Sequence, residues 1–155
     1  DAGLGVTIHA GEVPNSTFHP MLAAAEYGAT RIGHGYHIIE NDDEVQKALN
    51  ANIHFEVCPM SSYATEGAKK GNHALLHYQK SRLRNSISSD DPAVFRTDVF
   101  VELDHVLNEL QISGEEFANM QVHAIEDSFA PESIRQDVMQ RIRAYYFDEV
   151  VDGAT

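Results

Sequence analysis

Short apolar runs alternate along this chain with longer segments of helical periodicity. The apolar runs predict four strands, at 6–9, 30–34, 53–57 and 85–88. The intervening segments predict helices at 17–27, from 41 onward and at 73–79. The predicted strands begin 23 to 32 residues apart, which is the spacing of βα units. Because such units join parallel strands through a crossover helix, we expect one parallel sheet.

Cap signals mark the starts of predicted helices along the chain, and the residues after the fourth strand carry helix signals without strands. Asn41 can cap the second helix, with Glu44 reaching back to it. Ser113 and Glu116 form a capping box, and Pro131 suits the first turn of a last helix that ends near Tyr146. A further helix is expected over 98–110, with an apolar stripe formed by Val99, Leu103, Val106, Leu107 and Leu110.

Four βα units make only half of a closed barrel. Parallel strands need cover on both faces, so an upstream partner is expected. We therefore predict an α/β fold in which residues 1–155 are the second half of a (β/α)8 TIM-type barrel with additional C-terminal helices. The chain starts at Asp1 without an initiator Met, which fits a missing N-terminal half. A doubly wound open sheet is the alternative, but no Gly-rich phosphate loop follows the first strand.

Composition limits the partners that we expect. The formal net charge is -13, which disfavours nucleic acid and anionic membranes as partners. No apolar run approaches the roughly 20 residues of a membrane helix. Cys58 is the only cysteine, so no disulfide can form within the chain. This fits a reducing compartment, and we expect a cytoplasmic location.

Polar residues gather where the predicted strands end. His9 and Glu12 follow the first strand, His34 ends the second, and Asp90 and Asp91 follow the fourth. The carboxyl ends of barrel strands meet at one mouth, which is where active sites form. We therefore expect these five side chains to meet in space.

The residue types at the strand ends suit metal-assisted chemistry. Histidine and aspartate are good zinc ligands, and zinc lowers the pKa of a bound water. The remaining carboxylate and imidazole can orient that water and move protons. Taken alone, a histidine at a strand end is usually an ordinary polar residue, and Asp90-Asp91-Pro92 has the form of a turn. Adjacent carboxylates are costly, however, unless a cation or a proton offsets them.

Four motifs in order resemble the adenosine deaminase family, of the metal-dependent adenosine and AMP deaminases. The resemblance covers nearly the whole chain, and the order and spacing of the motifs make it specific. The motifs are His9-Ala10-Gly11-Glu12, Gly33-His34-Gly35-Tyr36-His37, Cys58-Pro59-Met60-Ser61-Ser62-Tyr63 and Ser88-Ser89-Asp90-Asp91-Pro92.

The resemblance implies a role for each candidate residue. His9 and Asp90 would be ligands of one Zn²⁺, and Glu12 would donate a proton to purine N1. His34 would position the hydroxide, and Asp91 would hydrogen-bond the base at N7. Ser61 and Ser62 are expected to line the substrate pocket. The family's other two zinc ligands form a His-x-His pair, which this chain lacks, so we expect them in the missing half.

The resemblance also implies the reaction, which is hydrolytic deamination of adenosine and 2′-deoxyadenosine to inosine and ammonia in purine salvage. A purine nucleoside and the missing half of the metal-dependent hydrolase domain are then the expected partners. AMP or adenine deaminase is an alternative, and so is a non-catalytic half-barrel or pseudoenzyme. Lys69 and Lys70 are the one credible pair of basic residues for binding a phosphate group. The simpler interpretation of this pair is that both are solvated charges in a loop. His73 and His77 could share a metal, but no carboxylate lies close in sequence to complete the site.

Overall fold

The computed structural model describes residues 3–14 and 20–148. Within them lies one four-stranded parallel sheet in the order β1-β2-β3-β4. Its strands are β1 (Thr7–Ala10), β2 (Arg31–His34), β3 (His54–Val57) and β4 (Arg84–Ile87). Each predicted strand is confirmed to within a residue or so, and the parallel pairing expected from βα units is confirmed as well.

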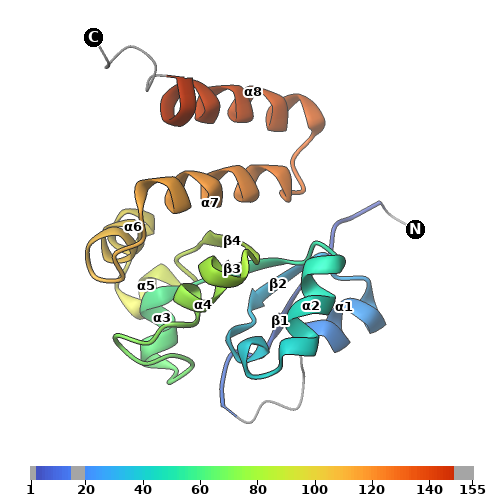
Figure 1. Ribbon diagram of the computed structural model, residues 1–155, viewed down its shortest axis with the longest axis vertical. Coiled ribbons are helices and arrows are strands. Elements are labelled where there is room, and N and C mark those ends of the chain that lie inside the picture. The colour runs from blue at the N-terminus through green and yellow to red at the C-terminus, as the bar shows by residue number, and fades with distance from the viewer. Residues whose placement is uncertain (1–2, 15–19, 149–155) are drawn as a thin grey trace.

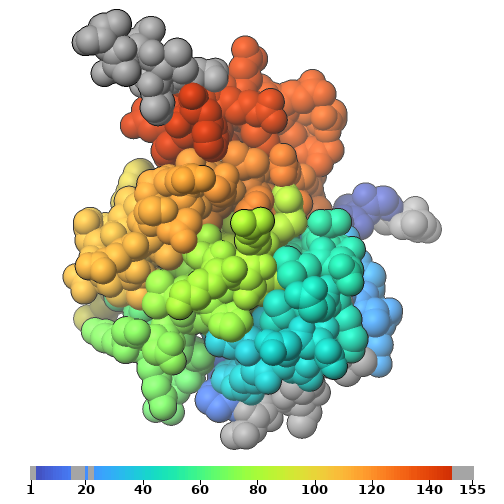
Figure 2. Space-filling model, viewed as in Figure 1, coloured from blue at the N-terminus to red at the C-terminus, as the bar shows by residue number. Residues whose placement is uncertain are grey.

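Helices surround this sheet and continue beyond it (Figure 1). α7 lies beside β4, whereas α8 packs along α7 on the side away from the sheet. The space-filling view shows α8 as an outer layer of the molecule (Figure 2). The helices are α1 (Pro20–Tyr27), η1 (Tyr36–Glu40), α2 (Asp42–Asn50), α3 (Pro59–Ala64), α4 (Ala74–Ser81), α5 (Pro92–Phe95), α6 (Val99–Asn108), α7 (Gly114–Glu126), α8 (Glu132–Arg143) and η2 (Ala144–Asp148).

The two faces of the sheet differ in polarity. Side chains alternate between the faces along a strand, and Ile32 and Phe55 share one face with the helices and are fully buried. Phe55 contacts the ring of Tyr78 from α4. The opposite face carries a polar row across all four strands, formed by Thr7, Arg31, His54 and Arg84.

Helix caps largely follow the sequence signals. Asn41 caps α2 by accepting from the backbone N–H groups of Asp43 and Glu44. The Glu44 carboxylate accepts from Lys47 instead of reaching back to the cap. The capping box of Ser113 and Glu116 is confirmed in full. Pro131 immediately precedes α8.

Two helices and one buried charge were not expected from the sequence. α3 lies directly after the third strand, where no helix was predicted, and α5 begins at Pro92 of the segment interpreted as a turn. The predicted stripe on 98–110 is partly wrong, because Val99 and Leu107 are 44% and 38% exposed. Glu102 occupies the buried side instead, where its carboxylate accepts from the Met60 N–H and the Thr97 hydroxyl. A hydrogen-bonding partner on another helix explains why a charged residue replaces an apolar one there.

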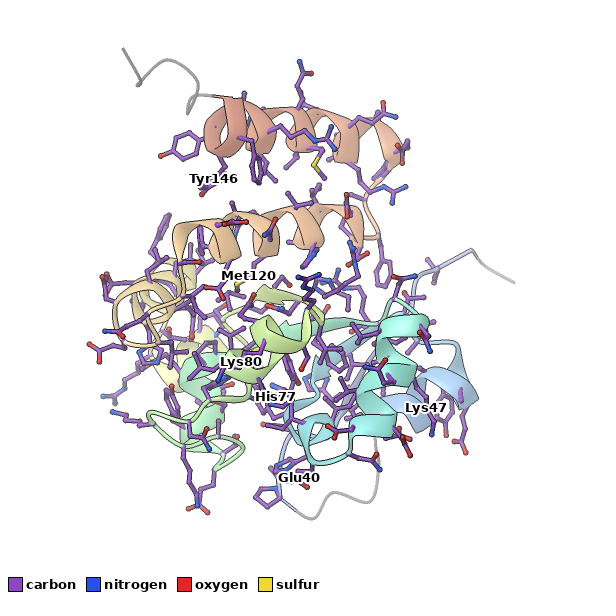
Figure 3. The ribbon with its side chains drawn as sticks, viewed as in Figure 1. Glu40, Lys47, His77, Lys80, Met120 and Tyr146 are labelled. Atoms are coloured by element: carbon purple, nitrogen blue, oxygen red, sulfur yellow. The ribbon has the colours of Figure 1, made fainter. Side chains whose placement is uncertain are left out.

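The outer helices are attached through α7. Met120 is fully buried on the side of α7 that faces the sheet, and Tyr146 stacks edge-on against Phe117 (Figure 3). Tyr145 and Phe147, the neighbours of Tyr146, are 68% and 41% exposed. The tail therefore packs on α7 rather than on the sheet.

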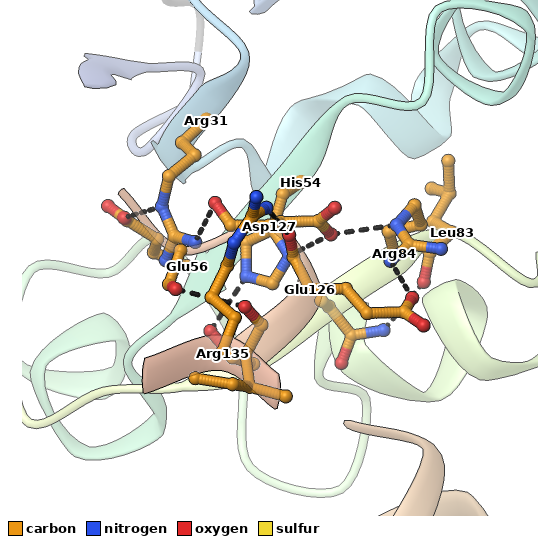
Figure 4. A network of polar contacts seen from close by, with 12 residues as sticks. Arg31, His54, Glu56, Leu83, Arg84, Glu126, Asp127 and Arg135 are labelled. Carbon is orange, nitrogen blue, oxygen red and sulfur yellow. Dashed lines mark hydrogen bonds and ion pairs between the residues drawn. The ribbon is translucent and has the colours of Figure 1, made fainter. Parts of the chain in front are cut away.

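A polar network joins the amino ends of the strands to the turn after α7 (Figure 4). The Asp127 carboxylate accepts from His54 Nδ1 at 2.8 Å and from Arg84 Nε at 2.7 Å. Arg31 pairs with Glu56 at 2.7 Å and donates to the Asp127 carbonyl oxygen. The Arg84 and His54 bonds lower the pKa of Asp127 despite its partial burial. This network fixes α7 and α8 to the edge of the sheet opposite the mouth.

Membrane insertion through a helix finds no support in the described residues, since none of their helices has the length and apolar character that crossing requires.

Candidate active site

Three of the predicted site residues meet at the carboxyl ends of the strands. His9 comes from β1, His34 ends β2, and Asp90 follows β4. One ligand atom from each lies within 4.8 Å of the others. His34 Nε2 is 3.9 Å from Asp90 Oδ2 and 3.6 Å from Glu12 Oε2, so Glu12 joins the cluster as a fourth member.

Close backbone approach makes this convergence possible. A Cβ on Gly33 would lie 3.2 Å from the His9 ring, so glycine leaves the space that the imidazole needs. A Cβ on Gly67 would lie only 2.5 Å from the Glu12 carbonyl oxygen, so the loop after α3 supports the backbone of Glu12. His34 and Asp90 have positive φ angles of 67° and 55°, which turn their side chains at the strand ends.

Burial dominates the electrostatics of His34. Its side chain is 2% exposed, and this desolvation lowers its pKa below the usual value, while Glu12 and Asp90 partly oppose the shift. The ring lies 4.9 Å, centroid to centroid, from that of His9. Burial thus favours the neutral form of His34, although its ring faces two carboxylates.

A small cavity opens beside the cluster. Its volume is about 220 Å³, and its lining consists of His9, Gly33, His34, Glu56, Cys58, Ser88, Ser89 and Asp90. Asp91 is exposed at the start of α5, outside this lining, and its carbonyl oxygen accepts from Val94 and Phe95. Larger hollows of about 550 and 560 Å³ border α8 and η2, but they contain none of the predicted site residues.

The structure does not bring Ser61 and Ser62 into this cavity. Both are fully buried in α3. The Ser61 hydroxyl donates to the Cys58 carbonyl oxygen, and the Ser62 hydroxyl donates to that of Pro59 and contacts His73 Nε2. Their hydroxyls hold the turn from β3 into α3.

Other residues at the site were not predicted individually. Glu56 and Cys58 line the cavity, and Tyr36 contacts His34. Alternation along β3 could have identified Glu56, because a residue two positions after His54 points to the same face. Burial raises the pKa of the Cys58 thiol far above its usual value, which favours the neutral thiol.

The donor chemistry of the cluster fits zinc. Imidazole nitrogens and a carboxylate oxygen are its usual ligands, and here they converge from three strands. A four-coordinate zinc site needs one donor more than the three residues His9, His34 and Asp90 supply.

A parallel βα sheet with histidine and aspartate side chains at its carboxyl ends is typical of the mouth of a βα-barrel enzyme. The family profile described as adenosine deaminase matches residues 1–145, and the chain belongs to that family. Rat (Rattus norvegicus) adenosine deaminase is 35% identical over 147 residues, which cover 93% of this chain and 41% of the rat protein. Chicken (Gallus gallus) adenosine deaminase is 32% identical, with 93% and 41% covered. The chain thus spans about two fifths of the relatives' length.

Solved structures agree on the fold. The adenine deaminase from Arthrobacter aurescens superposes with a TM-score of 0.83 at 26% identity, over 93% of this chain and 44% of that one. The N6-methyl-AMP deaminase from Arabidopsis thaliana gives 0.75 at 25% identity, over 92% and 41%. A zinc-bound amidohydrolase from Burkholderia ambifaria gives 0.82 at 18% identity, over 97% and 42%, which shows the fold alone. The sheet is therefore part of a TIM-type barrel, as the sequence predicted.

Proposed function

We propose that residues 1–155 form the C-terminal half of one metal-dependent hydrolase domain that deaminates adenosine and 2′-deoxyadenosine. The observation that carries the proposal is the meeting of His9, His34 and Asp90 within 4.8 Å at the ends of three strands. Membership of the adenosine deaminase family supports it. Water replaces the 6-amino group, so that adenosine gives inosine, 2′-deoxyadenosine gives 2′-deoxyinosine, and each reaction releases ammonia.

His9 and Asp90 would hold the zinc, together with two histidines from the N-terminal half. When bound, zinc would lower the pKa of a coordinated water toward neutrality. Binding by His9 fits its exposed position on the edge strand, where a further ligand-bearing strand can approach. The bound zinc would also offset the repulsion between the adjacent carboxylates of Asp90 and Asp91.

The proton chemistry falls to Glu12 and His34. Glu12 would protonate purine N1. His34, whose Nε2 lies 3.6 Å from Glu12 Oε2, would orient the attacking water and accept a proton from that water. Asp91 lies outside the cavity lining. In the proposed reaction, its carboxyl group would hydrogen-bond purine N7 of a substrate that extends beyond the cavity. Ser61 and Ser62 would act on the substrate only by shaping the turn beneath it, because their hydroxyls are bonded within the fold.

A nucleoside suits the charges around the site better than a nucleotide does. No Lys or Arg lines the described cavity, and Lys69 and Lys70 are exposed. Arg31 is paired with Glu56 on the sheet. A dianionic phosphate beside these carboxylates would need charge-assisted partners that this half does not offer.

AMP or adenine is the second candidate substrate. The similarity to an adenine deaminase and to an N6-methyl-AMP deaminase favours it. The deciding experiment is competition among adenosine, adenine and AMP at fixed ionic strength, using the full-length protein. The highest kcat/KM for adenosine is expected. A higher value for AMP or adenine would replace the nucleoside assignment, and zinc binding without turnover of any of them would favour a non-catalytic protein.

A further inference from the structure

Buried tyrosines hold His34 from two sides. The Tyr36 hydroxyl lies 3.3 Å from Nδ1 of the ring. The Tyr78 hydroxyl donates to the backbone carbonyl oxygen of His34 at 3.2 Å. Tyr36 is 2% exposed and Tyr78 is fully buried, so both bonds are shielded from water. Since the left-handed backbone of His34 is not an intrinsically favoured conformation, these contacts stabilise a residue that would otherwise relax.

Tyr36 also joins the ends of two neighbouring strands. Its hydroxyl accepts from the Cys58 N–H at 2.9 Å and donates to the Cys58 carbonyl oxygen at 3.1 Å. That carbonyl oxygen has two further donors, the Ser61 hydroxyl and the Ser62 backbone N–H. The carbonyl of Cys58 therefore stays satisfied even when the Tyr36 proton points elsewhere.

This arrangement lets Tyr36 serve either form of the His34 ring. When Nδ1 carries a hydrogen, it donates to the Tyr36 oxygen, whose own proton goes to Cys58. When Nδ1 lacks a hydrogen, the hydroxyl rotates and donates to it. Neither state leaves a buried polar atom without a partner. The ring can thus keep one orientation, with Nε2 3.6 Å from Glu12, in either tautomer.

We infer that Tyr36 is the positioning residue for His34, and that its hydroxyl holds the ring so that Nε2 faces Glu12 and Asp90. The inference rests on the proposed deaminase function, in which His34 takes part in proton transfer. Tyr36 is not part of the cavity lining, so it acts through His34 and not on the substrate.

The test compares Tyr36→Phe with Tyr63→Phe in the zinc-loaded full-length protein. Tyr63 is a matched control, because its hydroxyl bonds His105 Nε2 at 2.9 Å, outside the site. For Tyr36→Phe, kcat should fall by about 10- to 100-fold, the cost of a misplaced catalytic group. KM should stay within about threefold, since substrate contacts remain. The ring ¹⁵N signals of His34 should shift in Tyr36→Phe and stay in place in Tyr63→Phe.

A double-mutant cycle with His34→Ala separates positioning from general damage. If Tyr36 acts through His34, Tyr36→Phe should change kcat by less than about twofold once the imidazole is gone. Unchanged His34 signals in Tyr36→Phe, or a full loss of kcat on top of His34→Ala, would overturn the inference. If the wild-type protein deaminates no purine, the proposed function fails, while the ¹⁵N signals still decide whether Tyr36 orients the ring.

Discussion

His9, His34 and Asp90 draw on three strands, and two of these, β1 and β4, are the edges of the described sheet. The cluster therefore depends on the curvature of the whole sheet, although each member is a single side chain. His9 is also the exposed member of the cluster. Its role can be tested with little risk to the core.

Replacing His9 with Ala should abolish tight zinc binding in the full-length protein, because the site loses one of its few imidazole ligands. Metal content per chain after dialysis, measured by atomic spectroscopy, checks this. His77→Ala is the control, since His77 lies on α4 and outside the cluster. One zinc per chain with normal turnover in His9→Ala would remove His9 from the site.

Glu12→Gln should lower kcat by at least about 100-fold, because the amide keeps the size of the side chain but cannot cycle a proton. Zinc content should stay near that of the wild-type protein. Initial rates at saturating adenosine, alongside the exposed Glu26→Gln on α1, provide the measurement and its control. Wild-type turnover in Glu12→Gln would contradict the assignment of Glu12 as proton donor.

The sequence was informative about individual residues where strand ends could be located. It predicted that five side chains converge because parallel strands end at one edge, and four of them do, namely His9, Glu12, His34 and Asp90. The fifth, Asp91, is exposed and lies outside the cavity lining. The sequence was uninformative about Tyr36 and Glu102. Their partners, Cys58 and Met60, lie 22 and 42 residues away, and no local pattern signals such contacts.

Among the helices, α4 has an unusual N-cap. His73 Nδ1 accepts from the Leu75 N–H, and Nε2 lies 3.0 Å from the Ser62 hydroxyl, which itself donates to Pro59. Nε2 must therefore carry the proton, and the cap works only with a neutral ring. Burial accordingly lowers the pKa of His73 to about 4. Both ring nitrogens are used within the fold, so His73 does not share a metal with His77.

The His73 cap should make the folded state sensitive to acid. Because the folded pKa lies below the ordinary value of 6.5, its contribution is complete above pH 6.5 and is lost as the pH falls toward 4. Relative to His73→Asn, which can cap without titrating, the wild-type protein should lose about 3 kcal/mol of unfolding free energy over that range. Urea unfolding at several pH values checks this.

Comparison with His73→Asn cancels the effect of other groups that titrate in the same range. An equal acid dependence in both proteins would show that His73 does not govern it. His77→Asn offers a second control, since it changes a histidine on the same helix without touching the cap.

Sequence reasoning predicted elements well where caps and periodicity are local. The strands and the box of Ser113 and Glu116 fall into that class. α3 and α5 were missed because Cys58-Pro59 and Asp91-Pro92 were interpreted as a strand end and a turn. In both, proline occupies the first helical turn, a start signal that could have identified them.

For the molecule as a whole, Asp127 connects the tail helices to the strands. Asp127→Asn should destabilise the full-length protein by about 2 kcal/mol, because the bonds from His54 and Arg84 lose a charged acceptor. Asp137→Asn on the exposed side of α8 should change little. Chemical unfolding checks both. Equal stabilities for the two variants would mean that the network contributes nothing measurable.

The 155-residue chain on its own should associate or remain poorly packed. β1 has no strand on its outer side among the described residues. An open sheet edge invites pairing with other chains. Size-exclusion chromatography and thermal unfolding test this, and a monomer with a sharp, cooperative transition would contradict it.

The left-handed backbone at His34 and Asp90 sets local stability against the geometry of the cluster. Each non-glycine residue in this conformation costs about 1 kcal/mol or more, a strain that glycine does not bear. Glycine at either position would, however, remove a member of the cluster of His9, His34 and Asp90. The backbone is therefore strained at two of the strand ends where these side chains meet.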